Sequence, residues 1–122
     1  MYIGIDLGTS GVKSIAMTEQ GEIIASCTVS LEVSRPKPLW SEQDPSAWWE
    51  ATCESINGLK ASVNLSDVIA IGLSGQMHGA TLLDANGDVL RPASYGTMDA
   101  VKRNVKSLKR QCQTLVILPV IL

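Results

Sequence analysis

The chain has 122 residues, enough for one modest domain, and a formal net charge of −2. Its hydrophobic fraction is that of a globular protein, but no opening stretch of basic and then apolar residues predicts a signal peptide. No apolar run approaches the ~20 residues that cross a bilayer. The three cysteines are widely spaced, an odd number without a Cys-x-x-Cys pair, which argues against a disulfide framework and a zinc site. We therefore expect a cytoplasmic protein with reduced thiols.

Alternating apolar residues predict an N-terminal β-meander. Met1–Leu7 and Val12–Thr18 are expected to form strands, and Glu22–Val29 is expected to add a third strand after the turn signal Gln20-Gly21. Because side chains alternate across a strand, one face of the first strand carries its apolar residues. These residues are Ile3, Ile5 and Leu7.

The next segment predicts a connector and then a helix. Val33–Leu39 contains two prolines, which have no N–H for a sheet ladder, so we expect an extended connector. Asp44 can cap the free N–H groups of a helix, and Pro45 at the first helical position sacrifices no hydrogen bond. The helix is expected to run to about Ala61. The residues of its apolar face, at helical spacing, are Trp49, Cys53, Ile56 and Leu59.

Two further signals follow the helix. Val68–Leu73 is a short apolar run suited to a buried parallel strand. Ala80–Asp84 and Val89–Arg91 flank Asn86-Gly87, which is a strong hairpin signal. An antiparallel meander, a crossover helix and further strands together predict an α/β fold.

The first turn of the chain carries the candidate chemistry. An apolar strand delivers Asp6 into Gly8-Thr9-Ser10-Gly11. The glycines permit backbone angles that other residues resist, so the N–H groups of the turn and the hydroxyls of Thr9 and Ser10 can face phosphate oxygens. Asp6 is placed to hold a hydrated Mg²⁺, which prefers oxygen ligands, and Lys13 adds positive charge nearby. The competing interpretation is an ordinary hairpin with a solvated acid and a solvated Lys13.

This turn resembles the first phosphate motif of the actin-like ATPase superfamily, which includes sugar kinases, heat-shock ATPases and actin. Trp40-Ser41-Glu42-Gln43-Asp44-Pro45-Ser46-Ala47-Trp48-Trp49 is similar to the Trp-x-Glu-x-Asp-Pro-x-x-Trp-Trp segment of the FGGY family of carbohydrate kinases. Gly75-Gln76-Met77-His78-Gly79 resembles the substrate-side motif of one branch of that family, the xylulokinases. The three motifs occur in the family's order, and the resemblance covers about residues 1–93.

The resemblance implies a fold, a reaction and a site. The fold is a partial ribonuclease-H-like N-terminal domain, and the reaction is phosphorylation of D-xylulose at its terminal hydroxyl by ATP and Mg²⁺. Met77 and His78 are expected to contact the sugar, and the Gln76 amide can bond its hydroxyls. Asp6 is expected to organise the metal and the phosphates. The tryptophans have core packing as their default role, although Trp40 could line the sugar cleft of a complete enzyme.

The same resemblance implies that parts of a working kinase are missing. The general base, an Asp, and the second ATPase domain are expected beyond the residues present here, so we expect no turnover from this chain. The expected partner is a small-molecule sugar, and neither nucleic acid nor a membrane is expected as a partner. A homodimer is a possibility for the full-length enzyme. The alternatives are another FGGY kinase, of gluconate or glycerol type, and a non-enzymatic module whose basic tail binds an anionic partner. The bases of that tail are Lys102, Arg103, Lys106, Lys109 and Arg110.

Residues 94–122 depart from the family's pattern. Family members continue after Arg91-Pro92-Ala93 with a phrase like Leu-Trp-Asn-Asp-Gly-Arg-Cys, whereas this chain has Ser94 to Val101. Triplets that start at the third base of each of these codons permit the missing phrase. In the same shifted frame, Ile117–Leu122 permits Ile-Thr-Gly-Asn-Leu, another phrase of these kinases. We therefore predict a frameshift near Ala93.

The chain would accordingly consist of a partial kinase domain over residues 1–93 and a non-native tail over residues 94–122. The first part holds five Lys/Arg and eleven Asp/Glu, whereas the tail holds five Lys/Arg and one Asp/Glu. The alternative is a genuine basic helix over Met98–Gln113. The apolar end, Leu115–Leu122, combines high β-propensity with no charge.

Overall fold

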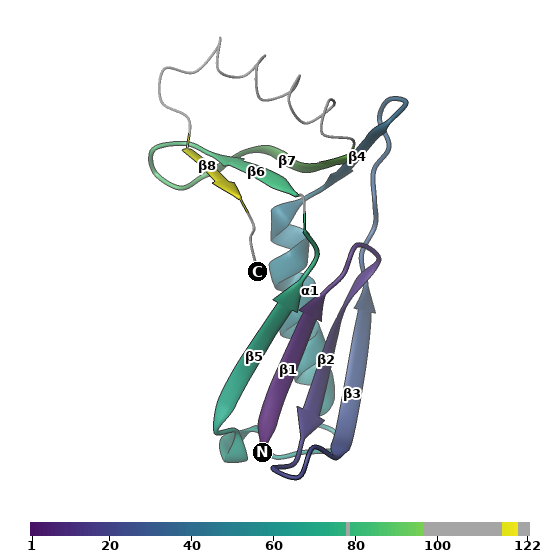
Figure 1. Ribbon diagram of the computed structural model, residues 1–122, viewed down its shortest axis with the longest axis vertical. Coiled ribbons are helices and arrows are strands. Elements are labelled where there is room, and N and C mark those ends of the chain that lie inside the picture. The colour runs from purple at the N-terminus through teal and green to yellow at the C-terminus, as the bar shows by residue number, and fades with distance from the viewer. Residues whose placement is uncertain (78, 97–115, 120–122) are drawn as a thin grey trace. The chain divides into compact units, whose positions relative to one another are not determined.

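The computed structural model describes residues 1–77, 79–96 and 116–119. They form two compact units, which are described separately (Figure 1). The first unit contains Met1–Glu32 and Ser46–Gln76. The second contains Val33–Pro45 and the described residues from Met77 onward. The Met98–Gln113 segment and most of the basic tail lie outside the described residues.

The first unit is built on a four-stranded sheet with the strand order β3-β2-β1-β5. Strands β1 (Tyr2–Leu7), β2 (Gly11–Met17) and β3 (Ile23–Ser30) are antiparallel neighbours, which confirms the predicted meander. The turn at Gly21 takes the positive φ of 86° that its glycine allows. Strand β5 (Ala70–Gly75) pairs parallel to β1, as the sequence predicted.

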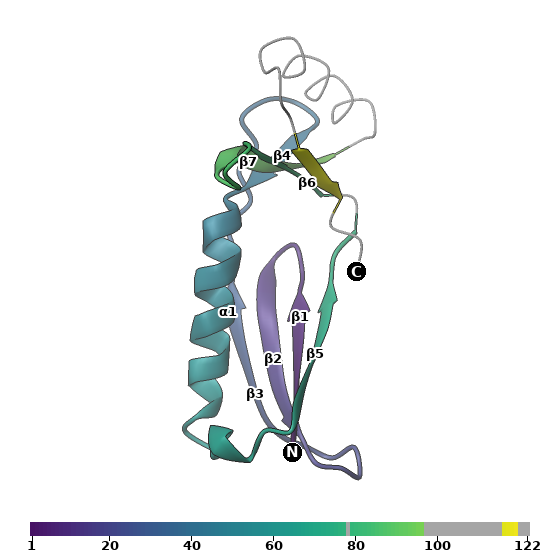
Figure 2. The ribbon, with the colours of Figure 1, turned by 90° about the vertical axis from the view of Figure 1, so that its left-hand side faces the viewer.

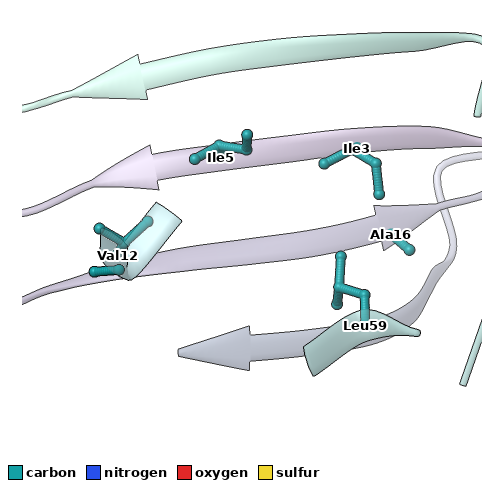
Figure 3. Packing of buried hydrophobic residues seen from close by; sticks show 6 residues of the cluster. Ile3, Ile5, Val12, Ala16 and Leu59 are labelled. Atoms are coloured by element: carbon teal, nitrogen blue, oxygen red, sulfur yellow. The ribbon is translucent and has the colours of Figure 1, made fainter. Parts of the chain in front are cut away.

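Helix α1 (Pro45–Leu59) and the short 3₁₀ helix η1 (Leu65–Asp67) make the crossover that a parallel strand requires. Figure 2 shows α1 running along one face of the sheet. Ile3 and Ile5 of β1 point to this face, which confirms the predicted alternation, and they pack with β2 and the helix end (Figure 3). The buried hydrophobic residues of this core are Ile3, Ile5, Val12, Ala16, Ala51 and Leu59.

The apolar face predicted for the helix is partly wrong. Leu59 is buried, but Trp49 is 71% exposed, and the other buried positions are Ala51 and Ser55. Small side chains let the helix lie close to the sheet, and Gly58 shows how close: a Cβ there would fall 2.3 Å from Cys27 Sγ. Ala51, Ser55 and Leu59 recur every four residues on the side of the helix toward the sheet, which leaves Trp49 on another side.

Strand β5 forms at the predicted place, but it is not buried as expected. Ile69, Ile71 and Leu73 are 64%, 57% and 67% exposed. The strand lies at the edge of its sheet, paired only with β1, and no described element covers it further. These apolar side chains of β5 are therefore left without a covering layer among the described residues.

The second unit is an antiparallel sheet with the order β4-β7-β6-β8. Strands β6 (Ala80–Leu83) and β7 (Val89–Gly96) form the predicted hairpin, and Gly87 in its turn has a φ of 89°. The sequence did not predict β4 (Trp40–Gln43), which pairs with the end of β7. Strand β8 (Val116–Pro119) lies in the apolar segment of high β-propensity and pairs with β6.

Two buried hydroxyls join β2 to α1. Ser14 and Ser55 are both fully buried, with their Oγ atoms 2.6 Å apart, and Ser55 Oγ also donates to the Thr52 carbonyl at 2.9 Å. A serine hydroxyl has one proton, and the Thr52 carbonyl can only accept it. The Ser55 proton therefore goes to Thr52, and Ser14 donates to Ser55.

This direction of donation predicts unequal costs for two similar substitutions. Ser55→Ala leaves the buried Ser14 hydroxyl without its acceptor and should lower the free energy of unfolding by about 1–3 kcal/mol. Ser14→Ala leaves the bond from Ser55 to Thr52 intact and should cost about 1 kcal/mol or less. Urea unfolding of the two variants and of the double variant measures the difference. Equal costs for the two single variants would contradict the assignment.

Gly11 provides a second stability test. It is the first residue of β2, and it lies close to the backbone of β3. A Cβ at Gly11 would lie 2.6 Å from the Val29 carbonyl oxygen, so Gly11→Ala should destabilise the chain by about 1–3 kcal/mol. Gly72→Ala is the matched control in the same sheet, since its Cβ would come no closer than 4.0 Å to the Ile3 oxygen. The control should change stability by about 0.5 kcal/mol or less, measured by the same unfolding titration.

Candidate functional site

The carboxyl ends of β1 and β5 lie together at one edge of the first sheet. The two strands are in parallel register, with Asp6 opposite Ser74 and Leu7 opposite Gly75. The pairing continues one residue further, because the Gln76 N–H donates to the Leu7 carbonyl at 2.9 Å. Ligand groups in open α/β sheets gather at this edge. The fold thereby brings the start of the Gly8–Gly11 turn beside the residue that follows β5.

The turn is held by hydrogen bonds from several directions. Its own closure is the bond from the Gly8 N–H to the Gly11 carbonyl at 2.9 Å. The end of β3 supports it through the Leu31 N–H, which donates to the Ser10 carbonyl at 2.9 Å. On the side of β5, the Thr9 hydroxyl donates to Gln76 Oε1 at 2.5 Å. The turn is therefore fixed before any ligand binds, as a preorganised binding site requires.

The glycines of the turn have a different role from the predicted one. The positive φ angles of the described glycines occur at Gly21 and Gly87, not at Gly8 or Gly11. What these two positions require is space: a Cβ at Gly8 would lie 3.2 Å from the Gly11 oxygen, and one at Gly11 would lie 2.6 Å from the Val29 oxygen. The expectation that unusual backbone angles demand these glycines was wrong. Glycine is needed at the two positions because another backbone segment comes too close to leave room for a Cβ.

Asp6 and Lys13 lie on the sheet face away from α1. Ile5 points into the core, so its neighbour Asp6 points to the other face, and Lys13 stands opposite Asp6 in register on β2. Both side chains are exposed, and neither belongs to an ion pair within the described part of the chain. With Ser74 they border a depression of about 400 Å³ that has Gly4 and Gly72 in its lining.

The turn also offers a free donor. The Ser10 N–H is exposed and donates to no acceptor among residues 1–77, 79–96 and 116–119. An unpaired N–H group in a turn that is followed by a lysine is suited to an anion, and a single carboxylate on the strand before the turn is suited to a hydrated cation. In the described residues no three His, Cys, Asp or Glu side chains lie together as a metal site.

Seven predicted site residues therefore come together in the first unit, while two do not. The seven are Asp6, Gly8, Thr9, Ser10, Gly11, Lys13 and Gln76. Met77 belongs to the second unit and is 66% exposed, and His78 lies outside the described residues. The predicted contact of these two residues with a sugar stays a prediction. Gln76 was expected to bond a sugar hydroxyl, but here its side-chain oxygen accepts the hydrogen bond from Thr9.

The second unit contains a cluster that the sequence did not predict. Glu42 is 8% exposed and forms an ion pair with Arg91, whose guanidinium lies 5.4 Å from the centre of the Trp40 ring. Lys37 lies 5.0 Å from the same ring centre. Alternation along β4 places Trp40 and Glu42 on one face, which is the sequence signal that could have suggested a shared partner. This cluster agrees with the packing role expected for Trp40.

Gly79 and Tyr95 are also in close contact in the second unit. A Cβ at Gly79 would lie 2.7 Å from Tyr95 Cε1, so the glycine at the end of the Gly75–Gly79 motif makes room for this ring. Burial raises the pKa of the Tyr95 hydroxyl. In the described residues, no helix has the length and apolar character needed to span a bilayer.

Comparison with known proteins connects these features to one family. The sequence profile described as "FGGY family of carbohydrate kinases, N-terminal domain" matches residues 1–117. The xylulose kinase of Escherichia coli strain K12 is 63% identical over 93 residues, which are 76% of this chain and 19% of that protein. The chain thus spans about one fifth of the length of the curated relatives it matches.

Solved structures give the same result for the fold. A xylulose kinase from Brucella ovis superposes with a TM-score of 0.76 at 44% identity, over 90% of this chain and 25% of that one. A glycerol kinase from Plasmodium falciparum, solved with ADP, superposes with a TM-score of 0.68 at 25% identity, over 92% of this chain and 24% of that one. The α/β arrangement of the chain is part of the actin-like ATPase fold of these kinases. The chain belongs to the FGGY family of carbohydrate kinases.

Proposed function

We propose that the full-length protein transfers the γ-phosphoryl group of ATP to the terminal hydroxyl of D-xylulose, giving D-xylulose 5-phosphate. The observation that carries the proposal is the Gly8–Gly11 turn, fixed between the ends of β1, β3 and β5 with Asp6 beside it. The match to xylulose kinases over the same residues supports the choice of sugar. The non-enzymatic alternative finds no support in residues 1–93.

The residues at this edge fit a nucleotide phosphate with Mg²⁺. The exposed Ser10 N–H and Lys13 can neutralise phosphate oxygens, and Asp6 can hold a hydrated ion as its carboxylate ligand. When bound, the ion neutralises charge that develops on the transferred phosphoryl group. The protein's task is to orient the phosphates, and a turn fixed in advance avoids the entropy cost of ordering the turn on binding.

The sugar and the proton acceptor complete the proposal. Met77 and His78 would bind the ketopentose, since they follow Gln76 and β5 in the sequence and lie in the motif that resembles the sugar side of these kinases. An Asp from the part of the protein beyond this chain would take the proton of the attacking hydroxyl. The 122-residue chain should therefore show no kinase turnover by itself.

A chimeric kinase tests the proposal without waiting for the rest of the natural gene. Residues 1–93 of this chain would replace the matching segment of the Escherichia coli xylulose kinase, to which they are 63% identical. The chimera should phosphorylate D-xylulose with ATP and Mg²⁺. Asp6→Asn should lower kcat/KM on the order of 10²-fold or more, the scale of a lost electrostatic contact to a transition state.

Asp88→Asn is the matched control for charge, because Asp88 is an exposed carboxylate in the turn of the β6–β7 hairpin. It should leave kcat/KM within about twofold of the parent chimera. A coupled assay for ADP release with xylulose, gluconate and glycerol compares the candidate substrates. Preference for gluconate or glycerol would replace xylulose as the substrate, and an unaltered rate for Asp6→Asn would refute the role of Asp6.

We also propose that residues 94–122 are a frameshifted tail. The two family phrases that the shifted triplets permit support this boundary. The alignment with the Escherichia coli relative covers 93 residues, whereas the family profile extends over residues 1–117. Ser94, Tyr95 and Gly96 nevertheless continue β7 opposite β4. This pairing is compatible with a foreign sequence, because a sheet ladder bonds through backbone groups that every residue except proline supplies.

Sequencing the gene across codon 93 and downstream tests this second proposal. We expect one base gained or lost near Ala93, and a kinase reading frame that continues beyond it in the shifted phase. A matching test restores the frame and measures soluble expression, which should rise because the apolar faces regain their covering elements. An intact frame that ends with the present tail in independent isolates would overturn the proposal.

A further inference from the structure

Gln76 makes a contact that its motif does not explain. Its side-chain oxygen accepts the hydroxyl proton of Thr9, a residue 67 positions earlier in the chain, across the edge where β1 and β5 end. We propose that Gln76 is a positioning residue: it fixes Thr9 and thereby the conformation of the phosphate-binding turn. This inference rests on the proposed function of the turn.

The backbone bonds of the turn separate positioning from folding. The Gly8–Gly11, Leu31–Ser10 and Gln76–Leu7 bonds all use main-chain atoms. They remain when the side chains of Thr9 and Gln76 change. Loss of the side-chain bond should therefore alter the orientation of the turn without unfolding the sheet that carries it.

The hydroxyl proton gives the contact a chemical consequence. Thr9 has one hydroxyl proton, and it is donated to Gln76 Oε1. While this bond is made, the Thr9 hydroxyl proton is held by Gln76, and the expected contact of this hydroxyl with a phosphate stays a prediction. The donors left for the phosphates are the Ser10 N–H, the Ser10 hydroxyl and Lys13, and the Thr9–Gln76 bond holds the turn from which the first two project.

The position of Gln76 in the chain extends the role. Met77 and His78, the proposed sugar-binding residues, follow it directly. The bond therefore acts on the turn proposed for ATP, and Gln76 also directly precedes, in the sequence, the two residues proposed for the sugar.

A double-mutant cycle in the chimeric kinase tests the link. Thr9→Val removes the donor with little change of shape, and Gln76→Met removes the acceptor at similar length. Each should lower kcat about fivefold to tenfold, the range expected from one neutral hydrogen bond. The double variant should be no worse than either single variant, because the two substitutions remove the same bond. Thr9→Ser, which keeps the hydroxyl, should retain near-parental kcat.

A second measurement keeps the inference independent of kinase activity. In the 122-residue chain, hydrogen exchange of the Ser10 and Gly11 amides reports the order of the turn. Thr9→Val and Gln76→Met should speed this exchange by similar factors, whereas Thr9→Ser should not. Exchange in the core strands should stay unchanged, which a general loss of stability would not allow.

The outcomes separate the two proposals. If the parent chimera has no kinase activity, the proposed function fails, and the exchange measurement alone decides whether Gln76 fixes the turn. If the chimera is active but the effects of the two substitutions on kcat add, the link between Thr9 and Gln76 is refuted. Unchanged amide exchange in both single variants would refute it as well.

Discussion

The parallel register of β1 and β5 is the constraint on which the candidate site depends. Leu7 stands opposite Gly75, so the turn after β1 and the segment after β5 leave the sheet at the same point. A slip of one residue would turn Ile3 and Ile5 out of the core and Asp6 into it. Such a slip would remove the two isoleucines from the core and cost the free energy of their burial. The hydrophobic alternation along β1 therefore fixes the position of the Asp6 carboxylate. The same strand register therefore determines both the packing of the core and the position of the candidate site.

Most elements of the fold could be predicted because their signals are local. The alternation of apolar residues predicted the meander, Asp44-Pro45 predicted the start of α1, and Asn86-Gly87 predicted the hairpin. The candidate turn was also predictable, since its residues are contiguous. Parallel pairing of β5 followed from an apolar run after a helix, a combination that leaves little other place for the strand. In each case a short window of sequence contains the whole physical cause.

The features that escaped prediction have causes spread over the chain. Strand β4 exists because residues about 50 positions later pair with it, as the register of Gln43 with Ala93 shows. Trp49 is exposed because α1 turns the side with Ala51, Ser55 and Leu59 toward the sheet. The need for glycine at position 11 comes from the Val29 carbonyl, and the partner of Thr9 comes from the far end of β5. Composition and periodicity describe short stretches of sequence, and they contain no information about contacts between residues far apart in the chain.

The Trp40–Trp49 segment shows why a motif that identifies a family need not carry its chemistry. Glu42 is buried in an ion pair with Arg91, Arg91 lies over Trp40, and Pro45 opens α1. A buried carboxylate left without its arginine is strongly destabilising, so Glu42 and Arg91 are constrained together whatever ligand the protein binds. In this chain the segment therefore serves to build the sheet and to start the helix. Chemistry has to be argued from Asp6 and the turn, where Asp6 and Ser10 are exposed and the Ser10 N–H donates to no acceptor in the described part of the chain.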